Sequence, residues 1–328
     1  MFYIFGGNGF VGRYLAIELS RRGKEATVID LHDALDSRIP SAVKYMKADI
    51  RNLHELEAIP FSEHDVVINL AAAQYHTKVP RNRHDYFFST NTVGTKNILT
   101  AMREKGCNRL IQFTTDMTYG KPEYLPVDTK HPQNPFGPYG ESKKACEEIC
   151  KEFRNTKHLT GGGINICIFR PRMISGPGRL GILVKLFKLI DMNSPVPTIG
   201  NGRNHYQMVS VFDCVSAILC AIEKGVPNKE YNLGSKESPD ITTLLRGVIK
   251  TARSRSFVLH TPGKLVKFML KILDTIGLTV MYPEQFMIAD EEYVLDISET
   301  EKDLDWHPQY NDEDMLIEAY KMYREGKA

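Results

Sequence analysis

The chain has 328 residues, which is enough for one large α/β unit or for two lobes. Its hydrophobic content of 42% and charged content of 25% are ordinary for a soluble globular protein. A net charge of only +2 gives no reason to expect nucleic acid or an anionic surface as a partner, and no apolar run is long enough to predict a membrane span.

The use of cysteine indicates a reducing compartment and no metal site. None of the six cysteines forms a CxxC pair, and Cys146 and Cys150 lack the His or Cys companions of a metal site. Reduced thiols in the cytoplasm are the simplest interpretation. Because Met1 leads directly into the strand-like residues 2–5, we also expect no signal peptide.

The first thirty residues have the pattern strand, glycine loop, helix, strand, acid. The apolar residues 2–5 predict a buried strand, residues 11–19 have helical periodicity that stops at Gly23, and residues 27–30 predict a second strand. This is the beginning of a dinucleotide-binding fold. The alternative is an ordinary glycine-rich turn between a strand and a helix.

The glycines of this loop stand at positions 6, 9 and 12, which is GxxGxxG rather than GxGxxG. Small residues let the backbone turn tightly and approach a pyrophosphate, and the start of the following helix supplies free N–H groups. We therefore predict that the loop binds the cofactor through Gly6, Gly9, Phe10, Val11 and Gly12.

Asp30, at the end of the second strand, indicates which cofactor is bound. A carboxylate there can hydrogen-bond the ribose hydroxyls of NAD but would repel the extra phosphate of NADP. Leu31 and His32 offer no Arg or Lys side chain to hold that phosphate. NAD is therefore the expected cofactor.

The next segments end in residues suited to the same ligand. Residues 43–47 predict a third strand, and Asp49 after it could contact the adenine, cap the following helix, or do both. Residues 65–70 predict a buried strand, and the small residues after it leave room for a ligand at the crevice of the sheet. A helical stretch from about 85 to 105 contains Asn91, either as a solvated side chain or as a buried hydrogen-bond anchor near the site.

The candidate chemistry lies on the next strand and helix. Residues 109–115 predict a strand that ends in Thr114 and Thr115, at the edge where open α/β sheets bind ligands. Tyr139 and Lys143 are four residues apart and face the same way on a helix. A phenol ionises near about pH 10, and a nearby ammonium lowers its pKa, so the pair can supply a base near neutral pH. An isolated YxxxK pair is common on surface helices, but the glycine loop, the acid and the threonines favour a catalytic one.

The second half of the chain is less regular and predicts a smaller lobe. Residues 164–169 predict another buried strand, after which residues 170–178 break the pattern. We therefore expect a dinucleotide-binding domain over residues 1–170, with returning segments at about 204–235, and a mainly substrate-binding lobe over residues 171–328.

The sequence makes specific predictions for two helical segments of this half. Asp213 is expected to cap a helix over residues 214–224. Residues 265–273 are amphipathic, and three lysines are spaced about one turn apart beside them: Lys264, Lys267 and Lys271. A helix packed on its own lobe with a solvated basic stripe is the first interpretation of this segment, and a membrane-surface helix is the second.

These motifs together resemble the extended short-chain dehydrogenase/reductase family, in particular its NAD-dependent nucleotide-sugar epimerases and dehydratases. The resemblance covers nearly the whole chain, since it also includes Arg170-Pro171, Gly176-Pro177-Gly178 and the segment around Trp306. It implies an α/β fold, a Rossmann-like doubly wound parallel sheet with a smaller C-terminal substrate-binding lobe.

The resemblance also implies the site residues. The catalytic set is Thr115, Asp116, Tyr139 and Lys143. The cofactor-binding set is Gly6, Gly9, Phe10, Val11, Gly12, Asp30, Asp49, Ile50, Leu70, Ala71, Ala72, Asn91, Thr114, Tyr139 and Lys143.

Two departures from the family pattern affect the reaction and the substrate site. Sugar 4,6-dehydratases usually have Glu where this chain has Met117, and methionine can neither accept nor donate a proton. Asp116 beside it either acts as an acid or only holds the loop. Gln207 stands where the family often has an Arg that grips the nucleotide's phosphates, so Arg172 and Arg203 are candidates to replace it.

The resemblance implies that Tyr139 removes a proton from a sugar hydroxyl, most simply at C4, while NAD takes hydride from the same carbon. Thr115 would orient the hydroxyl and Lys143 would bind the nicotinamide ribose. Because Met117 weakens dehydration, epimerisation is the expected outcome. The alternatives are a 4,6-dehydratase, a net dehydrogenase or ketoreductase, a non-enzymatic NAD-binding sensor or scaffold, and a membrane-associated sterol-type dehydrogenase suggested by the apolar stretch 257–281.

The expected partners are a nucleotide-diphosphate sugar and a second copy of the chain. A homodimer would form through the helices that carry Asn91 and Tyr139. We expect no nucleic acid, no membrane and no metal, and a cytoplasmic location.

Overall fold

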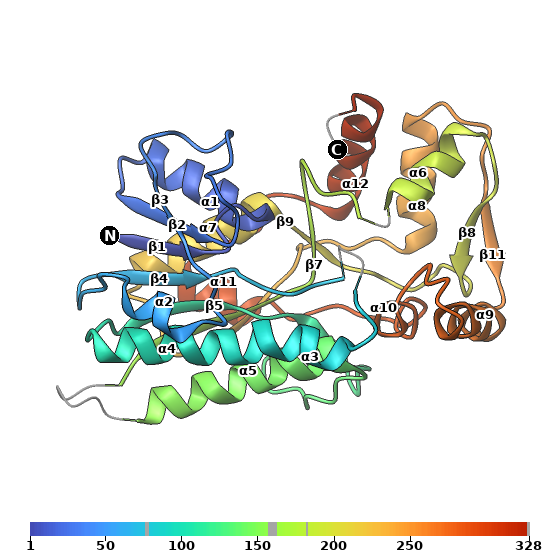
Figure 1. Cartoon of the computed structure of the whole chain (residues 1–328). Helices are drawn as coiled ribbons and strands as arrows, with labels where there is room; N and C mark the ends of the chain where they lie inside the picture. The colour runs from blue at the N-terminus through green and yellow to red at the C-terminus, as the bar shows by residue number, and fades with distance from the viewer. Residues whose placement is uncertain (76–78, 157–162, 182, 327–328) are drawn as a thin grey trace.

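The computed structural model describes residues 1–75, 79–156, 163–181 and 183–326. Its larger lobe is built on a seven-stranded parallel sheet with the order β10-β6-β5-β4-β1-β2-β3 (Figure 1). Helices cover both faces, which confirms the predicted Rossmann-like doubly wound α/β fold. The strands are β1 Phe2–Phe5, β2 Ala26–Asp30, β3 Lys44–Lys47, β4 Val66–Asn69, β5 Arg109–Phe113, β6 Asn165–Pro171 and β10 Glu230–Leu233.

The order of the strands reverses beside β1. From β1 the chain moves outward through β2 and β3 on one side, and then continues through β4, β5 and β6 on the other. In register, Phe5 at the end of β1 lies between Ile29 of β2 and Asn69 of β4. Open α/β sheets bind ligands at the carboxyl ends of their strands at such a reversal. The fold therefore brings the glycine loop and the ends of β4 and β5 to one crevice.

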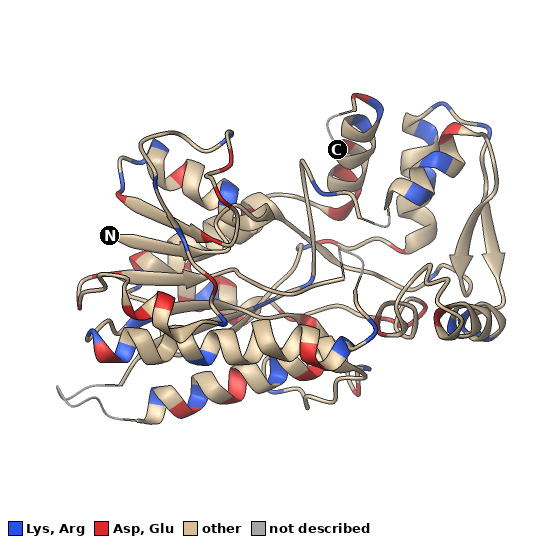
Figure 2. Ribbon diagram, in the orientation of Figure 1, with Lys and Arg blue, Asp and Glu red and all other residues tan. Residues whose placement is uncertain are grey.

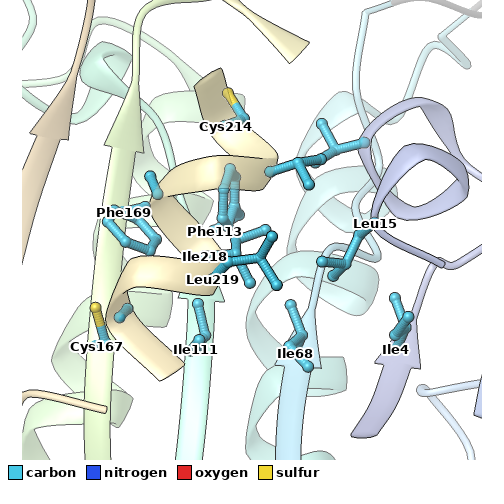
Figure 3. Close-up of a cluster of buried hydrophobic side chains, with 14 of the residues drawn as sticks. Ile4, Leu15, Ile68, Ile111, Phe113, Cys167, Phe169, Cys214, Ile218 and Leu219 are labelled. Carbon is cyan, nitrogen blue, oxygen red and sulfur yellow. The ribbon is translucent and has the colours of Figure 1, made fainter. Parts of the chain in front are cut away.

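Two apolar layers hold the helices on the sheet. On one face lie α1 (Phe10–Arg21) and α7 (Val211–Glu223), and on the other lie α2 (Leu53–Glu57), α4 (Gly94–Glu104) and α5 (Pro138–Asn155). Figure 3 shows the first layer, where side chains of α1 and α7 cover the strands: Leu15, Ile218 and Leu219 over Ile4, Ile68, Ile111, Phe113 and Phe169. Because inner strands such as β1 and β4 are buried on both faces, their sequences read as continuous apolar runs.

The helix predicted over residues 85–105 is three segments. It consists of α3 (Arg83–Phe88), the π-helical segment η1 (Ser89–Val93) and α4. Such π-helical turns insert one residue into a helix and are common at functional sites. Asn91 lies in this turn and is buried, so the hydrogen-bond anchor is the correct one of its two interpretations.

The predicted cap at Asp213 is wrong. Helix α7 begins at Val211, and the side chain of Ser210 caps it by accepting a hydrogen bond from the amide of Phe212. The carboxylate of Asp213 instead accepts the backbone N–H groups of Gln309 and Tyr310, at 2.9 and 3.2 Å. It therefore fastens the C-terminal segment to α7.

The smaller lobe lies beyond the carboxyl ends of the strands (Figure 1). It contains an apolar cluster of its own between three helices, α6 (Leu183–Asp191), α8 (Ile241–Thr251) and α12 (Asp312–Arg324). Its remaining elements are the strand pair β8 (Val196–Ile199) and β11 (Val258–Thr261), and the helices α9 (Gly263–Thr275) and α10 (Pro283–Phe286). The pair β7 (Met173–Ser175) and β9 (Met208–Ser210) connects the lobes, and α11 (Ser298–Leu304) contacts β10.

Within the described residues, no helix combines the length and the apolar character that crossing a bilayer requires. The same part of the chain has no group of three or more His, Cys, Asp or Glu placed to hold a metal ion. All six cysteines are free thiols.

A buried ion pair fastens α5 to the sheet. Glu147 of α5 and Arg170 of β6 are almost completely inaccessible, and Arg170 Nε lies 2.9 Å from Glu147 Oε1. Thr114 and Gln133 donate further hydrogen bonds to the same carboxylate, at 2.8 and 2.9 Å. Burial alone would raise the pKa of Glu147, but Arg170 and these donors outweigh it and hold the pKa below its usual value.

Removing one partner should destabilise the protein strongly. In Glu147→Gln the buried guanidinium loses its counter-charge, so we expect the free energy of unfolding to fall by about 3 kcal/mol. Urea unfolding followed by circular dichroism measures this loss. The control is Glu148→Gln, an exposed neighbour on the same helix, which should stay within about 0.5 kcal/mol of the parent. Equal stability of the two variants would contradict the role given to the pair.

Candidate active site

The glycine loop after β1 has no room for side chains at its turning points. Gly6 has a φ of +70°, which L side chains rarely adopt. A Cβ on Gly6 would lie 2.6 Å from the amide nitrogen of Ala71, and one on Gly12 would lie 2.4 Å from the carbonyl oxygen of Gly6. Gly9 stands at the N-cap of α1 without a side-chain cap, so the first-turn N–H groups stay open to an anion. This cradle fits the pyrophosphate of a dinucleotide.

A cavity of about 290 Å³ opens over the glycine loop, and we call it the dinucleotide cavity. Nine of the residues assigned to the cofactor line it: Gly6, Gly9, Phe10, Val11, Gly12, Leu70, Ala72, Thr114 and Lys143. Ala71 and Ile50 do not line it. Ala71 packs under Gly6, and Ile50 packs closely against Gly94 of α4.

Asp30 is held against the glycine loop. Its carboxylate accepts the backbone N–H groups of Asn8 at 3.0 Å and of Leu31 at 2.8 Å. These bonds fix an acid at the end of β2 against the glycine loop, although Asp30 itself does not line the cavity over that loop. The assignment of Asp30 to the ribose stays a prediction.

Asp49 does not cap α2, because the N-cap of that helix is Asn52. The carboxylate of Asp49 pairs with Arg51, which lowers the pKa of Asp49. Asp49 is not among the residues that line the dinucleotide cavity. Its predicted contact with the adenine therefore stays untested.

Tyr139 and Lys143 occupy the first two turns of α5, and both are buried. Thr115 follows β5 and lies close enough to Tyr139 that its hydroxyl lowers the pKa of the phenol, while it donates to Asp116 Oδ1 at 3.1 Å. Lys143 instead donates from Nζ to the carbonyl oxygen of Phe113 at 3.1 Å. Tyr139 and Thr115 line a second cavity of about 410 Å³, whereas Lys143 lines the dinucleotide cavity. The structure thus brings Thr115, Tyr139 and Lys143 to the walls of two cavities that share lining residues.

Burial dominates the ionisation of both groups. It raises the pKa of Tyr139 well above its usual value and lowers the pKa of Lys143. The positive charge of Arg179 opposes the shift in Tyr139, while the carboxylates of Asp116 and Glu284 add to it. The phenol of Tyr139 is therefore protonated near neutral pH in this structure, and the nearby cation Arg179 favours the phenolate.

The helix that carries Tyr139 is anchored through Asn91. The amide of Asn91 exchanges hydrogen bonds with the backbone of Ala73 after β4, at 2.9 and 3.2 Å, and donates to Ser142 Oγ at 3.0 Å. Ser142 Oγ donates in turn to the carbonyl oxygen of Tyr139 at 2.7 Å. Asn91 therefore positions the catalytic helix and does not line either cavity.

Asp116 and Arg172 form a buried ion pair in the wall of the larger cavity. The guanidinium of Arg172 lies between the rings of Tyr206 and Tyr293, with its central carbon 4.3 and 3.9 Å from their centroids. Tyr293 also donates to the carbonyl oxygen of Asp116 at 3.0 Å. Nε and Nη2 of Arg172 have no hydrogen-bond partner among the described residues. Arg172 therefore retains two unused donors at the cavity, while Asp116 is engaged.

The structure does not bring the other two substrate candidates to the site. Arg203 is exposed and lines neither cavity. Gln207 is buried, and both ends of its amide bind backbone, with Nε2 donating to the carbonyl of Ser235 and Oε1 accepting the amide of Leu295. Gln207 therefore joins three segments of the smaller lobe, and its side chain is not available to a ligand.

Two site residues were not identified from the sequence. Arg179 lines both cavities and donates to Gln74 Oε1 at 2.6 Å. It directly follows the Gly-Pro-Gly turn, and that position was the only signal. Glu284 of α10 is buried and accepts the backbone N–H groups of Tyr139 at 3.0 Å and Gly140 at 3.2 Å. It lies 145 positions from Tyr139, and no sequence pattern links the two.

Comparison with known proteins identifies the family of this chain. Residues 2–234 match the model of the NAD dependent epimerase/dehydratase family. A UDP-N-acetyl-alpha-D-glucosaminuronate decarboxylase of Bacillus cytotoxicus is 27% identical over 98% of this chain and 97% of its own length. A putative UDP-glucose 4-epimerase of Methanocaldococcus jannaschii is 29% identical over 74% of this chain and 80% of its own.

A solved structure has the same fold over the whole chain. The UDP-glucose 4-epimerase of Thermotoga maritima, determined with UDP-glucose, superposes with a TM-score of 0.78 at 20% identity, and 99% of each chain is covered. The family match spans more than half of the chain and includes the glycine loop, Thr115, Tyr139 and Lys143. The chain therefore belongs to the NAD-dependent epimerase/dehydratase family of nucleotide-sugar enzymes and uses NAD as its cofactor.

Proposed function

We propose that this enzyme epimerises a nucleotide-diphosphate sugar through transient oxidation of one carbinol, at C4 of the sugar. The observation that carries the proposal is the place of Tyr139 and Thr115, which both line the larger cavity, while Lys143 of the same helix as Tyr139 lines the dinucleotide cavity. A sugar in the larger cavity would present its hydroxyl to both side chains. The relatives named above as UDP-glucose 4-epimerases support this choice of reaction.

Each side chain has one task. Tyr139 takes the proton of the sugar hydroxyl as a general base, and Thr115 orients that hydroxyl. Lys143 reaches the dinucleotide cavity, where it would turn from the carbonyl of Phe113 to a ribose hydroxyl. NAD, when bound, supplies the hydride acceptor for the carbon. The chain itself contributes orientation, exclusion of water and control of the phenol's pKa.

The substrate's charged part has a matching group in the cavity. Arg172 lines the larger cavity and keeps two buried guanidinium nitrogens that no described residue uses, so a diphosphate or another anionic group of the substrate that reached them could accept from them. Lys185 also lines this cavity. Many family members grip the nucleotide's phosphates with an Arg at the position of Gln207. We propose that Arg172 takes over that role in this chain.

The environment of Asp116 favours epimerisation over dehydration. Dehydration needs an acid and a base that can exchange protons with the sugar. Asp116 is paired with Arg172 and accepts from Thr115 Oγ1 at 3.1 Å, so its carboxylate is already engaged. Met117 beside it cannot transfer a proton. The 4,6-dehydratase alternative thus has one of its two groups engaged and the other replaced, while the base needed for epimerisation is present.

Incubation with a panel of UDP and dTDP sugars tests the proposal. We expect one sugar to be converted into its C4 epimer without net consumption of added NAD. Tyr139→Phe should lower kcat by at least roughly a hundredfold, since a positioned general base contributes that much, and NAD affinity should be retained. The control is Tyr310→Phe, an exposed tyrosine outside both cavities.

Other products would contradict the proposal. Absorbance from a 4-keto-6-deoxy sugar would identify a dehydratase. Stoichiometric consumption of NAD with release of a ketone would identify a net dehydrogenase. Unchanged turnover in Tyr139→Phe would remove Tyr139 from the reaction.

The charges around Tyr139 should shift the pH dependence in opposite directions. Arg179→Met removes a cation that favours the phenolate, so the pKa of Tyr139 should rise and the ascending limb of kcat/KM should move to higher pH. Glu284→Gln removes an anion that disfavours the phenolate, so the limb should move to lower pH. Arg179→Lys keeps the charge and is the matched control. Shifts of the same sign in Arg179→Met and Glu284→Gln would show that Tyr139 is not the titrating base.

A further inference from the structure

Helix α9, at the end of the smaller lobe far from the sheet, exposes an apolar face (Figure 1, lower right). The side chains of this face are between 45% and 62% exposed: Leu265, Phe268, Met269, Ile272 and Ile276. At 100° per residue they occupy one arc of the helix. Leu278 and Val280 continue the exposed apolar surface in the segment after the helix. We call this set of seven residues the α9 face.

The α9 face is not needed to hold the helix on its lobe. The opposite side of α9 already supplies the packing, through buried Leu270 and the partly buried Val266 and Leu273. Polar contacts add to it, since Lys267 pairs with Asp290 and Asp274 pairs with Arg83. The helix is therefore apolar on both sides, which in a globular protein requires a second surface to cover the outer one.

Charge around the α9 face is one-sided. Residues 253–281 contain five basic residues and one acidic residue, Asp274, and that acid is neutralised by Arg83. Lys264 and Lys271 are exposed and border the apolar arc on one side (Figure 2 shows charged residues in blue and red). The net charge of +2 for the whole chain conceals this local concentration. An apolar face bordered by lysines is typical of helices that lie in a membrane interface.

We propose that the α9 face docks on the surface of an anionic lipid bilayer, with the apolar side chains in the headgroup region and Lys264 and Lys271 against lipid phosphates. A second copy of the chain fits less well, because a two-fold contact through this face would set the same lysines against each other. An anionic bilayer can cover the apolar arc and also bind the positive charges of the bordering lysines.

Docking in this orientation would place the substrate cavity at the membrane. Val280 belongs both to the α9 face and to the wall of the 410 Å³ cavity, and Tyr282 lines the same wall two residues later. The cavity therefore opens beside the docked face. This proposal departs from the expectation, drawn from composition, that no membrane would be involved.

Cosedimentation with lipid vesicles tests the proposal on the whole chain. We expect binding to phosphatidylcholine–phosphatidylglycerol vesicles, weak binding to phosphatidylcholine alone, and loss of binding at high salt. Phe268→Ser/Ile272→Ser and Lys264→Glu/Lys271→Glu should each lower the partition coefficient at least roughly tenfold. The readout is independent of catalysis, so failure of the proposed reaction would leave it unaffected.

Matched controls separate the α9 face from general surface effects. Met192→Ser removes an apolar side chain that is 70% exposed elsewhere on the lobe, and Lys224→Glu/Lys236→Glu reverses two exposed charges outside α9. Neither should change binding. The proposal is overturned if the parent chain binds neither vesicle at low salt, or if the controls weaken binding as much as the α9 variants. It is also overturned if Phe268→Ser/Ile272→Ser converts a dimer into a monomer in size-exclusion chromatography while the parent shows no vesicle binding.

Discussion

The carboxylate of Glu284 at the start of α5 is the contact on which the arrangement of the site depends. The first N–H groups of a helix lack partners within the helix, and Gly137, at the N-cap of α5, has no side chain to satisfy them. Glu284 supplies two acceptor bonds from the other lobe, to Tyr139 and Gly140. A negative charge is also favourable at this end of the helix dipole. The residue that we propose as the base is therefore seated by a group from the substrate lobe.

Aromatic contacts around Tyr75 connect Glu284 and Tyr139 to further residues of the smaller lobe. Tyr75 donates to Glu284 at 2.5 Å, its ring lies 5.5 Å from that of Tyr139, and it stacks on Tyr282 at 4.3 Å. Arg83 lies over Tyr282 and pairs with Asp274 of α9. Packed groups thus run without a break from α9 to the phenol of Tyr139. Because close-packed groups move together, the position of the smaller lobe and the geometry of the site are not independent.

The sequence predicted what depends on local pattern. Apolar runs that end in glycines or threonines identified the strands and the crevice, since a buried parallel strand needs a continuous apolar run whatever its partners are. The spacing of Tyr139 and Lys143 placed both on one helix, but it could not show that Lys143 bonds to Phe113 while Arg179 faces the phenol. Glu284 and the partners of Gln207 depend on contacts between distant segments, which have no local pattern. The apolar spacing of α9 was visible, but which of its faces stays uncovered is decided by the lobe on which it packs.

The pair of Asp116 and Arg172 illustrates the cost of burying charged groups in the wall of the larger cavity. A buried charge is costly unless it is paired, and each buried donor without a partner adds to the cost. Arg172 pairs with Asp116 and stacks between two tyrosine rings, yet two of its buried nitrogens find no hydrogen-bond partner in the described part of the chain. In the proposed reaction an anionic group of the substrate would supply the missing acceptors, which would recover free energy only while that substrate is bound. Asp116 is the counter-charge of Arg172, and under our proposal that ion pair, rather than proton donation to the sugar, is its role.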